Sequence, residues 1–280
     1  MKKLVLFTLF CVLITGVVFA GPDEDLIRAA RALDVSLLRE ALRRDANVNY
    51  STNEQTALMI ACEKSWVIGV RILLEDGANT DFANAHGMTA LMYAARFNNN
   101  LDIVNLLLNS YANVNARDNQ NKTVLMYAAE NQNDQMVDLL IRHGASLGAT
   151  NTYNQDALII AAINNNQTAV AQLLRGTVVN YSQADYNGKT AFIYACENEN
   201  IQLVRMFLQS GFDVLRANIV DGLPPLLWLI QWKKSYLIIE YLVRNTQAIA
   251  SRDSNGRDAF WYLDQYDRNN NRLRQLLSDR

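Results

Sequence analysis

The chain has 280 residues, half of them hydrophobic, with 26 Lys and Arg residues against 28 Asp and Glu residues. This apolar content excludes a disordered chain, and the net charge of −2 leaves no overall basic surface for nucleic acid. Only 2 His residues argue against a histidine-rich metal site or proton shuttle, and 12 Gly with 3 Pro argue against a loop-rich all-β fold.

Residues 1–20 are predicted to be a secretory signal peptide. Lys2 and Lys3 form a basic start, and a continuous apolar run follows them. Val18 and Ala20 occupy the two positions that a signal peptidase reads, so cleavage is expected after Ala20. A membrane anchor that stays in place is the alternative interpretation, but the apolar run is short for a membrane span.

The rest of the sequence repeats itself at intervals of 33 or 34 residues. The repeated segment has the form Thr-x-Leu-x-x-Ala-Ala, with degenerate copies toward the C-terminus. Its copies begin at Thr56, Thr89, Thr123, Asp156, Thr190, Pro224 and Asp258, and an atypical eighth unit begins near Glu24. A fixed period of this length indicates structural repeats that stack on one another.

Each unit is predicted to contain two helices. The repeated segment is a short helix whose first Thr or Asp caps the free N–H groups of the first turn. A second apolar pattern follows, as in Val70, Leu73 and Leu74, with the i, i+3, i+4 spacing of one helix face.

Asparagine-rich turns are expected between the two helices of a unit. We expect these residues to adopt the left-handed conformation that ends a helix, in place of glycine. The turns lie at 98–100, 131–133, 164–166, 198–200 and 269–271. Polar segments with a glycine shortly before the next cap are typical of β-hairpin loops between units.

This arrangement resembles the ankyrin repeat family over residues 23–280. The resemblance implies an all-α solenoid of about eight helix–turn–helix units with β-hairpin loops. Residues 21–280 are then a single domain whose first and last units act as caps with polar outer faces. The family's Pro after the capping Thr is kept only at Pro225, and a good helix former replaces it elsewhere, which is neutral for the fold.

The sequence offers no catalytic constellation. His86 and His143 belong to different units, and the motifs of metalloproteases, serine hydrolases, nucleotide-binding loops and zinc sites are missing from the sequence. We therefore predict a protein that is not an enzyme and that has no cofactor and no metal site.

Partner binding is expected at the hairpin tips and at the residues that follow each Ala-Ala pair, on the concave face. Aromatic side chains and Arg are frequent anchors of protein interfaces. The candidates are His86, Met88, Arg96, Phe97, Gln120, Tyr153, Tyr186, Lys189, Trp232 and Tyr266. The tyrosines at the fifth position of the short helices are instead expected to pack between repeats, namely Tyr93, Tyr127, Tyr194 and Tyr262.

The sequence thus predicts a non-catalytic protein–protein interaction module, exported from the cytoplasm to the periplasm or beyond. Its partner is a protein, not nucleic acid, and the chain is expected to be monomeric without a membrane span after signal cleavage. Cys62 and Cys196 lie four units apart and should stay as free, buried thiols. Two alternatives remain, a secreted effector that acts in a host cell and an accessory factor that protects or regulates a periplasmic enzyme.

Overall fold

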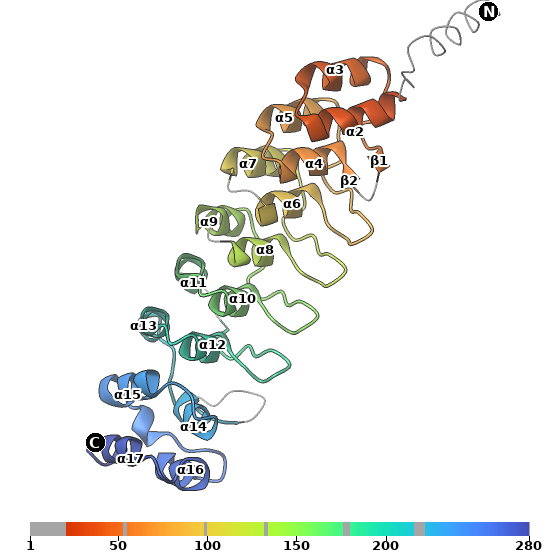
Figure 1. Cartoon of the computed structure of the whole chain (residues 1–280). Helices are drawn as coiled ribbons and strands as arrows, with labels where there is room; N and C mark the ends of the chain where they lie inside the picture. The colour runs from red at the N-terminus through yellow and green to blue at the C-terminus, as the bar shows by residue number, and fades with distance from the viewer. Residues whose placement is uncertain are drawn as a thin grey trace, which may run out of the picture. The chain divides into compact units, whose positions relative to one another are not determined.

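Helix pairs make up nearly all of the regular structure in the computed structural model (Figure 1), which describes residues 21–52, 55–97, 100–131, 134–175, 180–215 and 222–279. The predicted signal peptide lies outside the described residues. The described residues form two compact units, which divide between residues 113 and 114. None of the described helices combines the length and apolar character that crossing a membrane requires.

Three helix pairs lie among the described residues of the first unit. These are α2 (Pro22–Ala32) with α3 (Val35–Arg43), α4 (Ala57–Glu63) with α5 (Val67–Glu75), and α6 (Ala90–Phe97) with α7 (Leu101–Asn109). The first helix of each pair packs on the first helix of the next, α2 on α4 and α4 on α6, and the second helices do likewise, α3 on α5 and α5 on α7.

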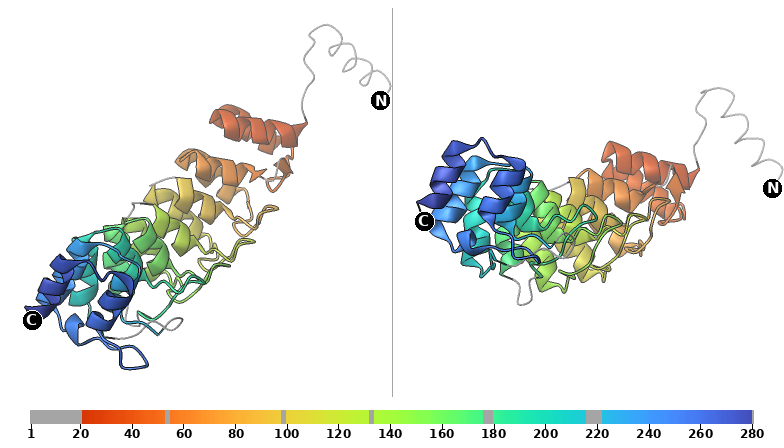
Figure 2. Two further views of the ribbon diagram at one scale, coloured as in Figure 1. Left: turned by 60° about the horizontal axis from the view of Figure 1, so that its bottom comes forward. Right: turned by 90° about the horizontal axis from the view of Figure 1, so that it is seen from below.

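The second unit contains five helix pairs among its described residues. These are α8 (Val124–Glu130) with α9 (Asp134–Arg142), α10 (Ala157–Ile163) with α11 (Gln167–Leu174), α12 (Ala191–Glu197) with α13 (Ile201–Gln209), α14 (Pro225–Gln231) with α15 (Tyr236–Asn245), and α16 (Ala259–Tyr266) with α17 (Asn271–Ser278). A short 3₁₀ helix, η1 (Ala248–Ala250), precedes α16. The predicted repeat architecture is confirmed, and the loops of this unit lie along one side of its helices (Figure 2).

The two helices of a pair are buried to different extents. All residues of α4 from Ala57 to Cys62 are buried, because this helix contacts α2, α5 and α6. In α5 only the face with Gly69, Val70 and Leu73 is buried. The caps form as the sequence predicts, since the Thr56 hydroxyl accepts a hydrogen bond from the N–H of Met59 at 3.3 Å.

Regular β-hairpins are rarer than predicted. In the described chain only β1 (Ser51–Thr52) and β2 (Gln55–Thr56) pair as antiparallel strands, with Ser51 opposite Thr56. Two later loops contain single bridges, between Arg117 and Thr123 and between Ala184 and Thr190. In these two loops the side chains of Asp118 and Asp185 accept backbone N–H groups of the turn, including those of Lys122 and Lys189.

The asparagine-rich turns are built differently from the prediction. Asn100, Asn166 and Asn200 each cap the N-terminus of the following helix with the side-chain oxygen. Of the described asparagines in these runs, only Asn165 has the left-handed conformation, at φ 55°, and Glu199 adopts it in the next repeat. These asparagines therefore satisfy the free N–H groups at the start of the second helix and do not end the first helix. Four further residues of the runs lie outside the described residues, namely Asn98, Asn99, Gln132 and Asn133.

Candidate partner-binding surface

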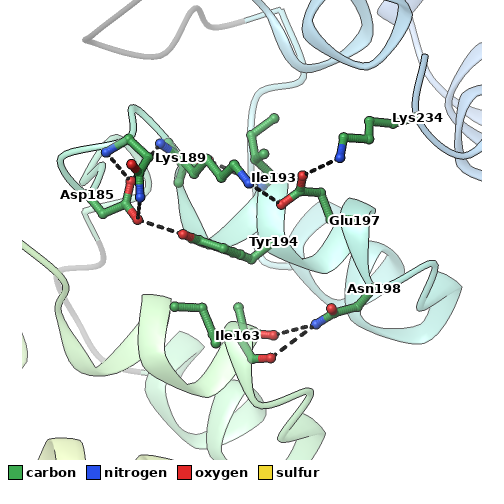
Figure 3. A network of polar contacts seen from close by, with 11 residues as sticks. Ile163, Asp185, Lys189, Ile193, Tyr194, Glu197, Asn198 and Lys234 are labelled. Carbon is green, nitrogen blue, oxygen red and sulfur yellow. Dashed lines mark hydrogen bonds and ion pairs between the residues drawn. The ribbon is translucent and has the colours of Figure 1, made fainter. Parts of the chain in front are cut away.

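Two short helices of the second unit, α8 and α12, have a long side chain that runs along their surface. In α12, the side chain of Lys189, the residue before the cap, passes 5.3 Å from the centre of the Tyr194 ring and reaches Glu197 at 2.7 Å (Figure 3). Lys122 repeats this arrangement over Tyr127 and pairs with Glu130. The residue before the cap and the residue after the Ala-Ala pair, eight positions apart, therefore form one surface.

In the first unit the same two positions are Met88 and Arg96, and the prediction for Met88 was wrong. Met88 was expected at the surface, but only 6% of it is exposed. A thioether carries no charge that would hold it in water, and its sulfur accepts a hydrogen bond from the Arg96 guanidinium at 3.9 Å. Arg96 itself is exposed, as predicted.

The recurring tyrosines attach the hairpins to the short helices. The Tyr127 hydroxyl donates to Asp118 at 2.6 Å, and the Tyr194 hydroxyl donates to Asp185 at 2.6 Å. Tyr262 donates to Asp253 at 2.9 Å. In the first unit, Asn84 donates to the Tyr93 hydroxyl at 3.2 Å. These hydroxyl groups thus bind the hairpin loop that comes directly before their helix, a contact that the sequence analysis did not predict.

Each of these Asp side chains also holds the turn of its own hairpin. The second carboxylate oxygen of Asp253 accepts the N–H groups of Asn255 and Arg257, both at 2.9 Å. Although desolvation alone raises its pKa, the hydrogen bonds from Arg257 and Tyr262 lower the pKa of Asp253 to about 2. Burial and the hydrogen bond to Asp253 raise the pKa of Tyr262 to about 12. Tyrosine and carboxylate therefore stay in the charge states that keep this contact.

A signal for this contact is present in the sequence. Three repeats have an Asp nine positions before the Tyr. In the repeat in which Ile160 replaces the tyrosine, Asn151 replaces the aspartate. Asn84 occupies the same position before Tyr93, so the signal is an Asp or Asn nine positions before the tyrosine.

Three of the predicted aromatic side chains are exposed at the ends of short helices. The exposed fraction is 48% for Phe97, 57% for Trp232 and 40% for Tyr266. Each lies beside the ring four positions earlier, with ring centres 5.8, 6.3 and 5.8 Å apart. We call these three residues the ledge aromatics. Packing on a neighbouring ring limits their side-chain freedom before any partner arrives.

The hairpin tips of the second unit form a connected edge. The N–H of Tyr186 donates to the carbonyl of Tyr153 at 3.2 Å, and the N–H of Thr152 donates to the carbonyl of Gln120 at 2.9 Å. The exposed fraction is 58% for Tyr153 and 75% for Tyr186. Gln120 and, in the first unit, His86 are also exposed. The structure thus brings Gln120, Tyr153 and Tyr186 together on neighbouring tips.

One carboxylate in the second unit is shared by two lysines (Figure 3). Glu197 contacts Lys189 at 2.7 Å and Lys234 at 3.0 Å, one ammonium group at each carboxylate oxygen. The sequence analysis did not find this contact, because Lys234 belongs to the next repeat. Close by, the side chain of Asn198 donates to the carbonyl of Ala162 at 2.8 Å and thereby links α12 to the repeat before it.

Family models match most of the chain. A model of three ankyrin repeats matches residues 26–118 and 112–183, and a model of one ankyrin repeat matches residues 187–219. The chain belongs to the ankyrin repeat family. The helix pairs α14–α15 and α16–α17 continue the same architecture beyond the last matched residue.

Two curated ankyrin repeat proteins share similar segments with this one. The identity is 38% over 97 residues to the ankyrin repeat protein FPV031 of fowlpox virus (strain NVSL), covering 34% of this chain and 28% of the viral protein. It is 37% over 76 residues to the ankyrin repeat, SAM and basic leucine zipper domain-containing protein 1 of Echinops telfairi, covering 25% of this chain and 16% of that protein. The matches therefore span less than a third of either relative.

Ankyrin repeats are in general interaction modules that bind other proteins and do not catalyse reactions. In the described parts of this chain, no group of three His, Cys, Asp or Glu side chains is placed to hold a metal ion. Both His86 and His143 are exposed. Nothing in the family matches or in the described residues points to enzymatic activity.

Proposed function

We propose that this protein is exported and binds a protein partner through the ledge aromatics and the hairpin tips. The observation that carries the proposal is the exposure of Phe97, Trp232 and Tyr266, each packed on a second ring. Large aromatic side chains that are already ordered lose little entropy on binding, and such residues dominate the energy of many interfaces.

The hairpin tips supply the second part of the proposed interface. Tyr and amide side chains combine a large contact area with adaptable hydrogen bonding, as in antibody loops. Tyr153, Tyr186 and Gln120 provide this combination on tips that share backbone hydrogen bonds. In the second unit, a partner would therefore contact the ends of the short helices and the adjacent tips together.

Export is supported by the N-terminal sequence and by the start of the first helix. Gly21 is the N-cap of α2, and Pro22 occupies its first turn. Cleavage after Ala20 would therefore leave the first helix whole. Mass spectrometry of protein recovered from the periplasm or medium should give a chain that begins at Gly21. Recovery of the chain with residues 1–20 attached would contradict export by cleavage.

The binding proposal is tested with alanine variants of the full chain. Phe97→Ala and Trp232→Ala should each weaken partner binding by about thirtyfold, which corresponds to about 2 kcal/mol. The controls are Ile68→Ala and Leu237→Ala, because these side chains are 56% and 49% exposed but lie on the second helices α5 and α15. Binding that is weakened equally by the controls would contradict the proposal.

The partner is captured by crosslinking in the native compartment and identified by mass spectrometry. A periplasmic enzyme among the captured proteins would favour the role of an accessory factor. A protein of a host cell would favour the role of a secreted effector. Binding through the ledge aromatics is tested equally in both cases.

A further inference from the structure

The group formed by Lys189, Lys234 and Glu197 carries a surplus positive charge. Two ammonium groups from neighbouring repeats share one carboxylate, so the three side chains have a net charge of +1. The side chain of Glu197 is 15% exposed, whereas Lys189 and Lys234 are 27% and 40% exposed. Each ammonium has three N–H donors, and one contact to Glu197 does not use them all.

The corresponding groups of other repeats in the second unit are balanced. Lys122 contacts one carboxylate, that of Glu130, among the described residues. Arg257 has Gln265 in place of the glutamate, and its guanidinium pairs with Asp253, the counterpart of Asp185, at 2.6 Å. The equivalent positions of the repeat between α8 and α12 are Gln155 and Ile163, which carry no charge. Among these described pairs, the surplus cation belongs only to the group around Glu197.

The surplus charge lies beside the buried ring of Trp228, which in turn packs against the exposed indole of Trp232. The ammonium of Lys189 is 5.8 Å from the centre of the Trp228 ring, and that ring lies 6.3 Å from the ring of Trp232. Trp232 is 57% exposed and precedes Lys234 by two residues. We call Lys189, Lys234, Glu197 and Trp232 the lysine–tryptophan site.

We propose that this site binds an acidic segment of the protein partner, with an Asp or Glu beside an apolar or aromatic side chain. The partner's carboxylate would accept the unused N–H donors of Lys234 and Lys189, and its apolar side chain would cover the indole of Trp232. A basic segment would meet two ammonium groups, and a neutral segment would leave the surplus charge unpaired. This inference rests on the proposed function and adds the chemistry of the bound segment.

The substitution Glu197→Gln tests the proposal because it should strengthen, and not weaken, the binding of an acidic segment. It removes the carboxylate that competes for both lysines and keeps the shape of the side chain. The probes are immobilised decapeptides in which one Trp, Phe or Leu is flanked by Asp and Glu, with two matched sets that carry Asn and Gln or Lys instead. The full-length protein should bind the acidic set about tenfold more tightly than the amide set, since each charge-assisted hydrogen bond contributes on that scale.

Glu197→Gln should strengthen binding to the acidic peptides severalfold, and Lys234→Met and Trp232→Ala should weaken it. Lys122→Met is the matched control, because Lys122 lies over Tyr127 as Lys189 lies over Tyr194, and it should change nothing. Thermal melting shows that each variant is folded. Raising the salt concentration should weaken the acidic set most.

Three results would overturn this inference. They are equal binding of the acidic and amide peptides, no binding of the acidic peptides, and weaker binding of the acidic peptides by folded Glu197→Gln. None of these results decides whether the ledge aromatics bind a partner. That question is decided separately, by the loss of the native partner from Phe97→Ala and Trp232→Ala. A partner that is lost from these variants without any acidic preference would leave the proposed function standing and refute the acidic segment.

Discussion

Asp156 makes the stability of the second unit depend on pH. It caps α10, where the equivalent caps Thr123 and Thr190 are neutral, and its side chain accepts the N–H of Ile159 at 2.8 Å. Asp156 is 5% exposed. Burial raises its pKa from 3.8 to about 6, although the N–H groups of Ile159 and Leu158 act in the opposite direction.

The sign of the effect follows from the two pKa values. Between pH 3.8 and pH 6 the folded chain binds a proton at Asp156 that the unfolded chain has released. This contribution to stability is complete below pH 3.8 and is lost as the pH rises through 6. The difference of about two pH units is equivalent to about 3 kcal/mol, of which about 1.4 kcal/mol is lost above pH 5.

Asp156→Thr should remove this pH dependence and keep a cap. In urea unfolding, the free energy of unfolding of the variant relative to wild type should rise by about 1.4 kcal/mol between pH 5 and pH 8. Asp258→Thr is the control, because Asp258 caps α16 with a partly exposed side chain that faces Arg252, and it should bring no gain at pH 8. The same difference between variant and wild type at both pH values would refute the reasoning.

Three further predictions concern the hairpins, the core and the thiols. Tyr127→Phe should lower the free energy of unfolding by about 1–2 kcal/mol and speed amide exchange in residues 118–122, because a buried carboxylate loses its donor; unchanged exchange would contradict this. Leu107→Ala should cost about 2–5 kcal/mol by urea unfolding and Phe97→Ala less than about 1 kcal/mol, and equal losses would mean that Phe97 belongs to the core. Burial raises the pKa of the Cys62 and Cys196 thiols, so both should react with a thiol reagent only when the chain unfolds, and a disulfide on a non-reducing peptide map would contradict their staying reduced.

The helix pairs were predictable because their signals are local. Caps such as Thr56 and the spacing of Val70, Leu73 and Leu74 act within one or two turns of the chain. The same holds for the exposure of Phe97, since the short helix ends there. These features depend on neighbours close in the sequence, which a single repeat already contains.

Features that depend on side-chain direction or on the next repeat were not predictable in the same way. The pattern places Met88 between the hairpin and the cap but does not show that its side chain is buried. The pairing of Glu197 with Lys234 joins residues 37 positions apart, and it requires the stacked repeats to bring them together. The sequence does not show whether an asparagine in these runs ends one helix or caps the next. Asn166 and Asn200 cap the N-terminus of the following helix.

The central claim, that the ends of the short helices bind a protein partner, is tested most directly by site-specific photo-crosslinking. Two variants carry a photoreactive phenylalanine analogue, one in place of Trp232 at the end of α14 and one in place of Leu237 on α15. The variant with the analogue at position 232 should capture a partner protein from the native compartment, and the variant with the analogue at position 237 should not capture it. Capture through position 237 alone, or equally through both positions, would contradict the account.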